Sequence, residues 1–325
     1  MSSNSGIEWT DHTFNPWWGC TKVHDGCTNC YAEALDKRWG GEHWGNSPRR
    51  MVLGEWGKPA RWNAEAVASG LRRRVFCASM CDLFEDHAGD VVDQRGNPAM
   101  KSPPRPSGGG EHQGERWTVP MLRARVFEMV NETTMLDWLL LTKRPENITR
   151  MVPASWLRDW PANVLTGTSP CNQKTADKCI PDLLNVPGRH FLSCEPLLGH
   201  VNLTKINLRD KGTYDKWRNA LDNTFWQAPG CLDDGTPTEK SMLLQAGRGI
   251  DWVIVGCESR GKRAGRFADG YVDAAKRIND QCRSAGVPVF NKQVPVEGRV
   301  SHDPGEWPEG IRSRDFYAAM SGATP

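Results

Sequence analysis

Long apolar runs and a strong net charge are what this sequence lacks. No stretch reaches the roughly 18 consecutive apolar residues that a transmembrane helix needs. The polar start, Met1–Asp11, has no apolar centre of the kind found in secretory signal peptides. We therefore expect a cytoplasmic protein with no membrane partner. The formal net charge is only +2, which gives no global electrostatic case for nucleic-acid binding but allows a local basic groove.

Cysteine and tryptophan are plentiful by comparison, with 11 and 15 residues. Cysteines in a reducing compartment rarely build a disulfide framework, and an odd number cannot all pair within one chain. A tight cluster of cysteines is therefore better explained by metal ligation. Most of the tryptophans are expected in the core because each buries a large area, and some could line a pocket for a flat substrate.

Several short apolar runs recur along the chain, and most of them end in polar residues. Most are continuously apolar rather than alternating, which is typical of strands covered on both faces of a parallel sheet. They span residues 74–79, 138–142, 163–169, 189–194, 252–257 and 287–292.

Helical patterns lie between these runs. Apolar residues follow helical spacing in three places: Ala32, Leu35 and Trp39; Leu122, Val126, Met129 and Val130 after Pro120; and Val272, Ala275, Ile278 and Cys282. Alternating strands and helices predict an α/β fold, a partial (βα) barrel forming one domain over residues 1–325. In such folds the chemistry takes place at the C-terminal ends of the strands.

Two stretches interrupt this alternation and are interpreted as insertions. Residues 86–116 are rich in glycine, proline and charge, above all 102–110, and predict a flexible loop or linker. Residues 203–250 carry charges, aromatics and glycines without a clear period. This second insertion is either a lid or substrate-recognition element, or a plain surface excursion.

A cysteine cluster near the N-terminus is the strongest chemical signal. Cys20, Cys27 and Cys30 have the spacing C-x6-C-x2-C, with Gly19 and Gly26 in the loop. A C-x2-C pair places two sulfurs on one tight turn, and thiolates favour zinc or iron–sulfur clusters. Three ligands would leave one iron of a four-iron cluster open, so we prefer the cluster. A Cys3His zinc site that includes His24 is the main alternative, and three unrelated core thiols are another.

Five motifs resemble the phage Gp37/Gp68 family (DUF5131), which is similar to radical S-adenosylmethionine (SAM) enzymes. Together they extend over most of the chain, at residues 11–20, 27–32, 141–147, 192–198 and 252–259. The resemblance implies a TIM-like partial barrel of the radical SAM type. It also implies a [4Fe–4S] cluster on Cys20, Cys27 and Cys30, with SAM on the open iron. An external electron donor, flavodoxin-like or dithionite in vitro, would reduce the cluster.

Two departures from the common radical SAM pattern concern this loop. The first gap has six residues rather than three. Asn29 precedes the third cysteine, where an aromatic is usual, and Tyr31 follows it. Both departures bear on the pose of SAM more than on the cluster, and Asn29 is counted among the cofactor-binding candidates.

Further cofactor-binding candidates follow the predicted strands. Ser79 and Asp82 come after residues 74–79, where the resemblance implies contact with the amino group or ribose of SAM. Asp82 as a helix N-cap is the structural alternative. Thr142, Lys143 and Arg144 end the next run and could bind the SAM carboxylate or a substrate phosphate, or be solvated loop residues. The serine at 169 is expected to touch SAM.

The catalytic candidates are Lys143, Glu195 and Glu258. Each glutamate directly follows a cysteine at the end of a predicted strand. Such a carboxylate could bind ribose or substrate or move a proton, and a structural hydrogen-bond acceptor is the alternative. Lys292 and Gln293, at the end of the last run, are candidates of the same kind.

The other cysteines are interpreted as packing residues. Cys77 and Cys81 lack a further ligand pair nearby, and Cys194 and Cys257 lie in predicted strands, although either of the latter could donate a hydrogen atom to a product radical. The basic segment 260–266 could contact phosphates, or be a solvated surface loop.

Two functions compete at this point. The first is a radical SAM enzyme that rearranges or modifies a nucleobase in phage DNA, such as a hypermodified thymine, with aromatics stacking on the base. The second is a non-catalytic nucleic-acid-binding protein stabilised by zinc on Cys20, His24, Cys27 and Cys30.

Overall fold

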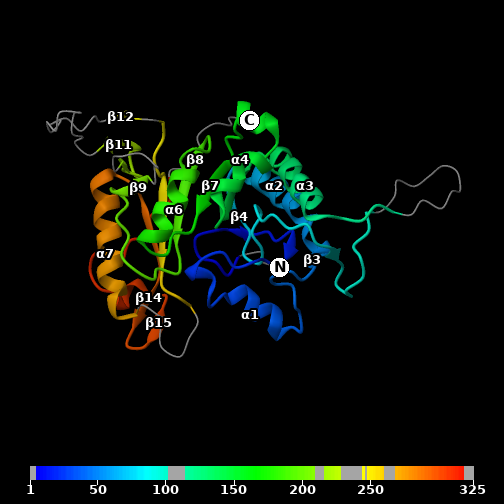
Figure 1. Ribbon diagram of the computed structural model, residues 1–325, viewed down its shortest axis with the longest axis horizontal. Coiled ribbons are helices and arrows are strands. Elements are labelled where there is room, and N and C mark those ends of the chain that lie inside the picture. The colour runs from blue at the N-terminus through cyan, green and yellow to red at the C-terminus, as the bar shows by residue number, and fades with distance from the viewer. Residues whose placement is uncertain are drawn as a thin grey trace, which may run out of the picture.

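The computed structural model describes residues 5–101, 114–208, 216–227, 244–245, 247–259 and 268–317. Its centre is an eight-stranded sheet in the order β1-β4-β6-β7-β8-β13-β14-β15, curled into half a barrel (Figure 1). Neighbouring strands run parallel except for the antiparallel pair β14 and β15. The strands are β1 His12–Thr13, β4 Arg73–Cys77, β6 Leu136–Thr142, β7 Val164–Thr168, β8 Arg189–Cys194, β13 Trp252–Gly256, β14 Val289–Val296 and β15 Arg299–Ser301.

All the apolar runs predicted as strands lie in this sheet. Their central residues are buried on both faces, which explains why the runs are continuously apolar. The half-barrel confirms the α/β class with a mostly parallel sheet. Strand β1 escaped prediction because it has two residues, His12 and Thr13, which pair with Val75 and Phe76 of β4.

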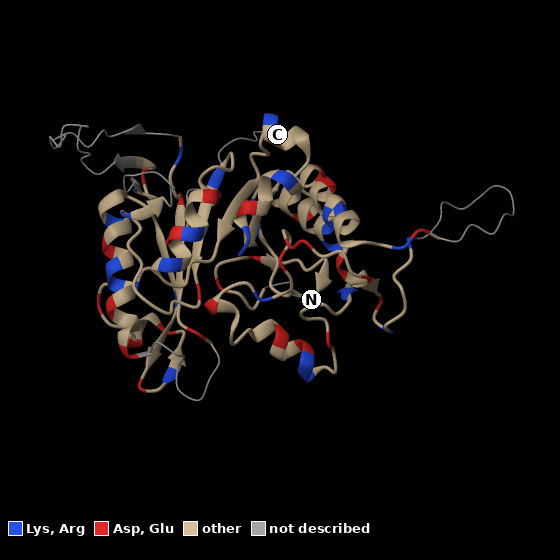
Figure 2. Cartoon of the chain, in the orientation of Figure 1, with Lys and Arg blue, Asp and Glu red and all other residues tan. Residues whose placement is uncertain are grey.

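Four helices cover the outer face of the sheet: α2 Lys58–Ser69, α3 Val119–Glu132, α6 Gln173–Leu183 and α7 Ala268–Ala285. Helix α3 begins where proline predicted it, after the N-cap Thr118, whose hydroxyl accepts a hydrogen bond from the Met121 amide. Its predicted apolar face is buried against the sheet, as is that of α7 at Ala275, Ile278 and Cys282. Acidic and basic side chains are mixed along these helices (Figure 2).

The inner face of the sheet forms a second core that fills the half-barrel. Alternate side chains along each strand point to the inner face. They include Phe76, Leu139, Leu165, Phe191 and Trp252. Trp9 from the N-terminal segment and Tyr317 from the C-terminal segment pack on this cluster. The half-barrel is therefore a packed core and not an open channel.

The remaining elements surround the sheet. A small sheet combines β2 Trp17–Trp18, β3 Arg49–Met51 and β5 Val91–Val92, and helix α1 spans Tyr31–Arg38 as predicted. Short helices follow β6 at α4 Ile148–Met151 and α5 Ala154–Arg158. Single 3-10 turns are η1 Asp25–Cys27, η2 Leu53–Glu55, η3 Pro145–Asn147 and η4 Pro304–Glu306.

Both insertions contain strands within their described parts. In 86–116, β5 pairs with β3, and bridges join Val92 to Pro98 and Met100 to Arg116, so this part is a paired arm. Residues 102–110 lie outside the described residues. In 203–250 an antiparallel sheet has the order β12-β11-β10-β9, and it packs on α6 through β9. Its strands are β9 Ile206–Leu208, β10 Lys216–Arg218, β11 Thr224–Gln227 and β12 Leu244–Gln245.

Among the described residues, no helix is both long and apolar enough to cross a membrane.

Candidate functional site

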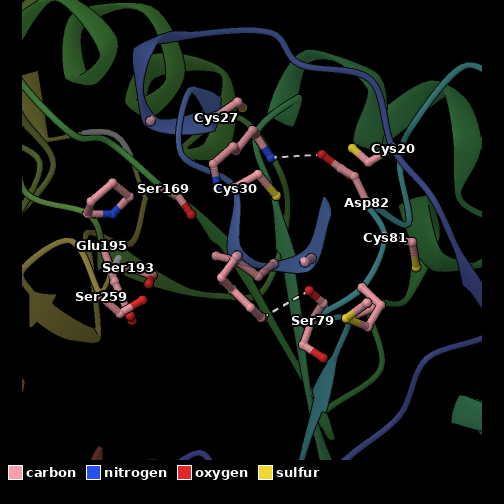
Figure 3. Close-up of a pocket in the computed structure, with 18 of the residues that line it drawn as sticks. Cys20, Cys27, Cys30, Ser79, Cys81, Asp82, Ser169, Ser193, Glu195 and Ser259 are labelled. Atoms are coloured by element: carbon pink, nitrogen blue, oxygen red, sulfur yellow. Dashed lines mark hydrogen bonds between the residues drawn. The ribbon is translucent and has the colours of Figure 1, made fainter. Parts of the chain in front are cut away.

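A pocket of about 170 Å³, part of it open to solvent, lies at the C-terminal ends of the parallel strands (Figure 3). Ile7, Trp9, Phe76 and Leu141 of the inner core contribute apolar lining. The cysteine loop forms one side of the pocket, and residues that follow β7, β8 and β13 form the other.

All the cysteines of the N-terminal cluster line this pocket. Cys20 follows β2, Cys27 ends η1, and Cys30 is the N-cap residue of α1. The loop between the cysteines is held by His24, whose carbonyl and Nδ1 accept hydrogen bonds from the amides of Cys27 and Gly26 at 2.9 and 3.0 Å.

Within the described residues, no group of three or more His, Cys, Asp or Glu side chains is arranged to hold a metal ion. A zinc ion needs four donors at about 2.0–2.3 Å from a single centre. A four-iron cluster is held differently, because each cysteine binds a different iron and the sulfurs stand farther apart. The three thiols line one pocket together, which a cluster held by three cysteines requires.

Cys20 lies against a buried ion pair. Nη1 of Arg144 is 3.7 Å from the Cys20 sulfur and 2.8 Å from Oδ2 of Asp82. Nη2 of the same guanidinium donates to the Thr21 carbonyl at 2.6 Å. Burial raises the pKa of Cys20 to about 12, the carboxylates of Asp82 and Glu85 act in the same direction, and Arg144 acts against them.

The Asp82 carboxylate is engaged with protein groups rather than with open solvent. Oδ1 accepts from the Thr142 hydroxyl at 2.7 Å and from the Phe84 amide at 3.0 Å, while Oδ2 accepts from the Lys143 amide at 3.1 Å and from Arg144. Asp82 therefore caps a turn, and it ties the segment after β4 to the end of β6. Thr142 shares this role, although both residues line the pocket.

Ser79 is fixed by two residues that the motif analysis did not select. Asn15 accepts from the Ser79 amide at 2.9 Å and donates to its hydroxyl at 3.1 Å. Tyr31 donates its hydroxyl to the Ser79 carbonyl at 2.9 Å. The segment after β4 is thus joined both to the Asn-Pro-Trp-Trp motif and to α1.

The wall opposite the cysteine loop carries hydroxyls and carboxylates (Figure 3). Ser169 is 1% exposed, and its hydroxyl has no hydrogen-bond partner among the described atoms. Glu195 forms an ion pair with Lys292 at 2.5 Å. Gly256 makes room for this glutamate, because a Cβ at position 256 would lie 3.2 Å from the Glu195 Cγ.

The other predicted site residues divide between pocket and core. Asn29, Lys143 and Glu258 line the pocket, with Asn29 exposed and Glu258 buried. Gln293 does not line it, and its side chain donates to the Cys257 carbonyl at 2.6 Å. The segment 260–266 lies outside the described residues. Ser259, the residue before it, is described and lines the pocket.

Four other cysteines were interpreted as packing residues. Cys77, Cys194 and Cys257 are buried, and burial raises the pKa of each thiol. Cys81 and Cys257 also line the pocket. The cysteine at 81 is half-buried, and Gly19 forms a parallel β-bridge with it, which brings the segment after β4 beside the start of the cysteine loop.

A second buried ion pair, between Arg49 and Glu85, lies next to the cysteine loop. Arg49, fully buried, donates to both carboxylate oxygens of Glu85 at 2.9 Å. It also donates to the carbonyls of His43, Ser47 and Gly45. No local motif marks this pair, since its members are far apart in the sequence.

Fold and site together define an α/β half-barrel protein with a cysteine-lined pocket at the carboxyl edge of its parallel strands. The chain belongs to the family described as protein of unknown function (DUF5131), whose model matches residues 4–102 and 118–303. No curated protein and no solved structure matches it.

Proposed function

We propose that this protein is a radical SAM enzyme. The observation that carries the proposal is the meeting of Cys20, Cys27 and Cys30 with polar strand-end residues in one pocket at the carboxyl edge of a half-barrel. In this interpretation the half-barrel is the partial TIM-like barrel of the radical SAM type, and the cysteines hold a [4Fe–4S] cluster with one iron open to SAM.

The cofactors would supply the radical chemistry, and the chain would position them. Cys20, Cys27 and Cys30 would hold the cluster, and an external electron donor, flavodoxin-like in the cell, would reduce it. The bound cofactors would then supply reductive cleavage of SAM to methionine and a 5′-deoxyadenosyl radical, for hydrogen abstraction from the substrate.

The residues around the pocket suggest how SAM is held. The unpartnered Ser169 hydroxyl and the exposed Asn29 have polar groups available for a ligand. Ser79, Asp82 and Thr142 are tied to one another or to neighbouring segments, so they shape the SAM site more than they contact it.

The substrate we propose is a nucleobase in phage DNA, rearranged or modified on its side chain. Tyr31, an exposed aromatic that lines the pocket, offers a ring on which a base could stack, and Lys143, Glu195 and Glu258 offer hydrogen bonds or proton transfer at the polar wall.

One experiment tests the proposal against a zinc protein. The chain is purified anaerobically, reconstituted with iron and sulfide, and incubated with dithionite and SAM, and 5′-deoxyadenosine is measured. We expect release by the wild type and by His24→Ala, and none by Cys27→Ala. Cys194→Ala is the matched control because that thiol is buried away from the pocket. A colourless protein that holds one zinc, and loses it in His24→Ala, would overturn the proposal.

A further inference from the structure

We propose that Arg144 and Asp82 form a charge pair that sets the reduction potential of the metal centre through Cys20. The inference rests on the proposed function, because it needs a redox-active cluster on the cysteines. It adds a positioning role for two residues that the function itself does not require.

The pair is in direct contact with the ligand sulfur. Nη1 of Arg144 lies 3.7 Å from the Cys20 sulfur and 2.8 Å from Oδ2 of Asp82, so one nitrogen joins the sulfur and the carboxylate. The side chains of Arg144 and Asp82 are only 8% and 7% exposed. With water largely excluded, a charge at this distance acts strongly on the sulfur.

Two further charged residues, Arg49 and Glu85, lie near this pair, and Arg144 is the member of the network that contacts the Cys20 sulfur. Glu85 lies 3.7 Å from Nη2 of Arg144, but its two oxygens are bound at 2.9 Å by Arg49. The two arginines and two carboxylates form a neutral group. Removing one charged member therefore leaves an uncompensated charge beside Cys20.

Arg144 is also not available to bind the SAM carboxylate or a substrate phosphate, the role that the sequence suggested for it. Both of its terminal nitrogens already bind protein groups, Nη1 at Asp82 and Nη2 at the Thr21 carbonyl. A guanidinium held in this way presents a fixed charge to the cysteine loop. Hydrogen bonds and charges around a ligating sulfur are among the means by which proteins tune iron–sulfur potentials.

The direction of each effect follows from charge. Reduction adds an electron to the centre, so a nearby cation stabilises the reduced form and raises the potential, and a nearby anion does the opposite. Arg144→Met removes the cation and should shift the potential to more negative values. Asp82→Asn removes the anion and should shift it to more positive values.

The test is a redox titration of the reconstituted protein, with iron and sulfide content measured first. We expect opposite shifts for Arg144→Met and Asp82→Asn, and a potential near the wild-type value for the double variant. Arg144→Lys, which keeps the charge, should shift less than Arg144→Met. Arg150→Met is the control, because Arg150 pairs with Asp86 on the exposed surface.

The outcomes separate this inference from the proposed function. A wild type that takes up no cluster overturns the proposed function and this inference with it. A loaded wild type whose variants keep its potential, or shift it in the same direction, overturns this inference alone. Folded variants that all fail to load show that the pair acts only as a support for the loop, which also overturns it.

Discussion

At the level of single residues, the pocket contains polar atoms of two kinds. Some are bound by the protein itself, as in Asp82, which accepts from four groups. Others have no partner, as in Ser169, whose hydroxyl is buried. An unpartnered buried hydroxyl weakens a fold, so its presence at a pocket indicates a ligand contact.

Replacing Ser169 by alanine should separate these two effects. We expect unchanged or slightly higher stability, because an unsatisfied buried group is removed, and SAM affinity weaker by roughly twofold to tenfold, the equivalent of one hydrogen bond. Thr166→Val is the matched control, since the Thr166 hydroxyl is also buried without a partner but does not line the pocket. Equal SAM binding by Ser169→Ala and the wild type would contradict this contact.

His190 should make stability depend on pH. Burial lowers its pKa, although its Nε2 is 2.8 Å from the Val186 carbonyl. The unfolded histidine titrates near pH 6.5, so below that pH the unfolded chain binds more protons than the folded one. The free energy of unfolding should therefore fall as the pH drops below about 6.5. Urea titrations at several pH values should show a smaller fall for His190→Gln, and an equal fall would refute this assignment.

Some residues of the candidate site could be predicted from local sequence patterns, and others could not. The three cysteines were found from their spacing, and Ser169 and Glu195 from their position at strand ends. The contact of Arg144 with Cys20 spans 124 residues, and no local pattern encodes it. The same holds for Asn15, which reaches Ser79 only because β1 lies beside β4.

At the level of elements, strand β7 shows how closely neighbouring strands are packed on the inner face of the sheet. Gly167 lies opposite Phe191 of β8, and a Cβ there would come within 2.4 Å of that ring. The glycine leaves the space that the ring fills in the inner core.

Gly167→Ala should lower the free energy of unfolding by about 1–3 kcal/mol through overpacking. Gly57→Ala is the control, because nothing lies within 4 Å of its Cβ position and its φ is −88°. Chemical denaturation of both variants provides the comparison. Equal stability of the two variants would mean that Phe191 can move aside.

Elements with a strong local pattern were predicted, and others were not. The buried strands and helices α1, α3 and α7 follow from apolar spacing. Helix α6 was missed, since Pro181 lies inside it and breaks the expected pattern. The small sheets were missed because their strands are short and their pairing depends on distant segments.

At the level of the whole molecule, segments from near the start and near the end of the described chain meet inside the half-barrel. Trp9 and Tyr317 both pack on Trp252, with ring centroids 6.1 and 5.2 Å away. The Trp252 indole donates to the Asp315 carbonyl at 2.8 Å. The C-terminal segment therefore completes the inner core beneath the pocket.

Tyr317→Ala should cost about 3 kcal/mol of stability, as for other buried aromatic truncations. Phe316→Ala, at a neighbouring position that is 41% exposed, should cost about 1 kcal/mol. Thermal or urea unfolding of the two variants measures the difference. If Phe316→Ala proved the more damaging, the C-terminal segment would not complete the core in this way.

The most direct test of the central claim is an electron paramagnetic resonance spectrum of the reconstituted, dithionite-reduced chain, recorded before and after SAM is added. We predict about four irons and four sulfides per chain and the signal of a reduced [4Fe–4S] cluster. The signal should change with SAM, because one iron lacks a protein ligand and can bind it. A cluster signal that SAM leaves unchanged, or a chain that takes up no iron, would contradict the account.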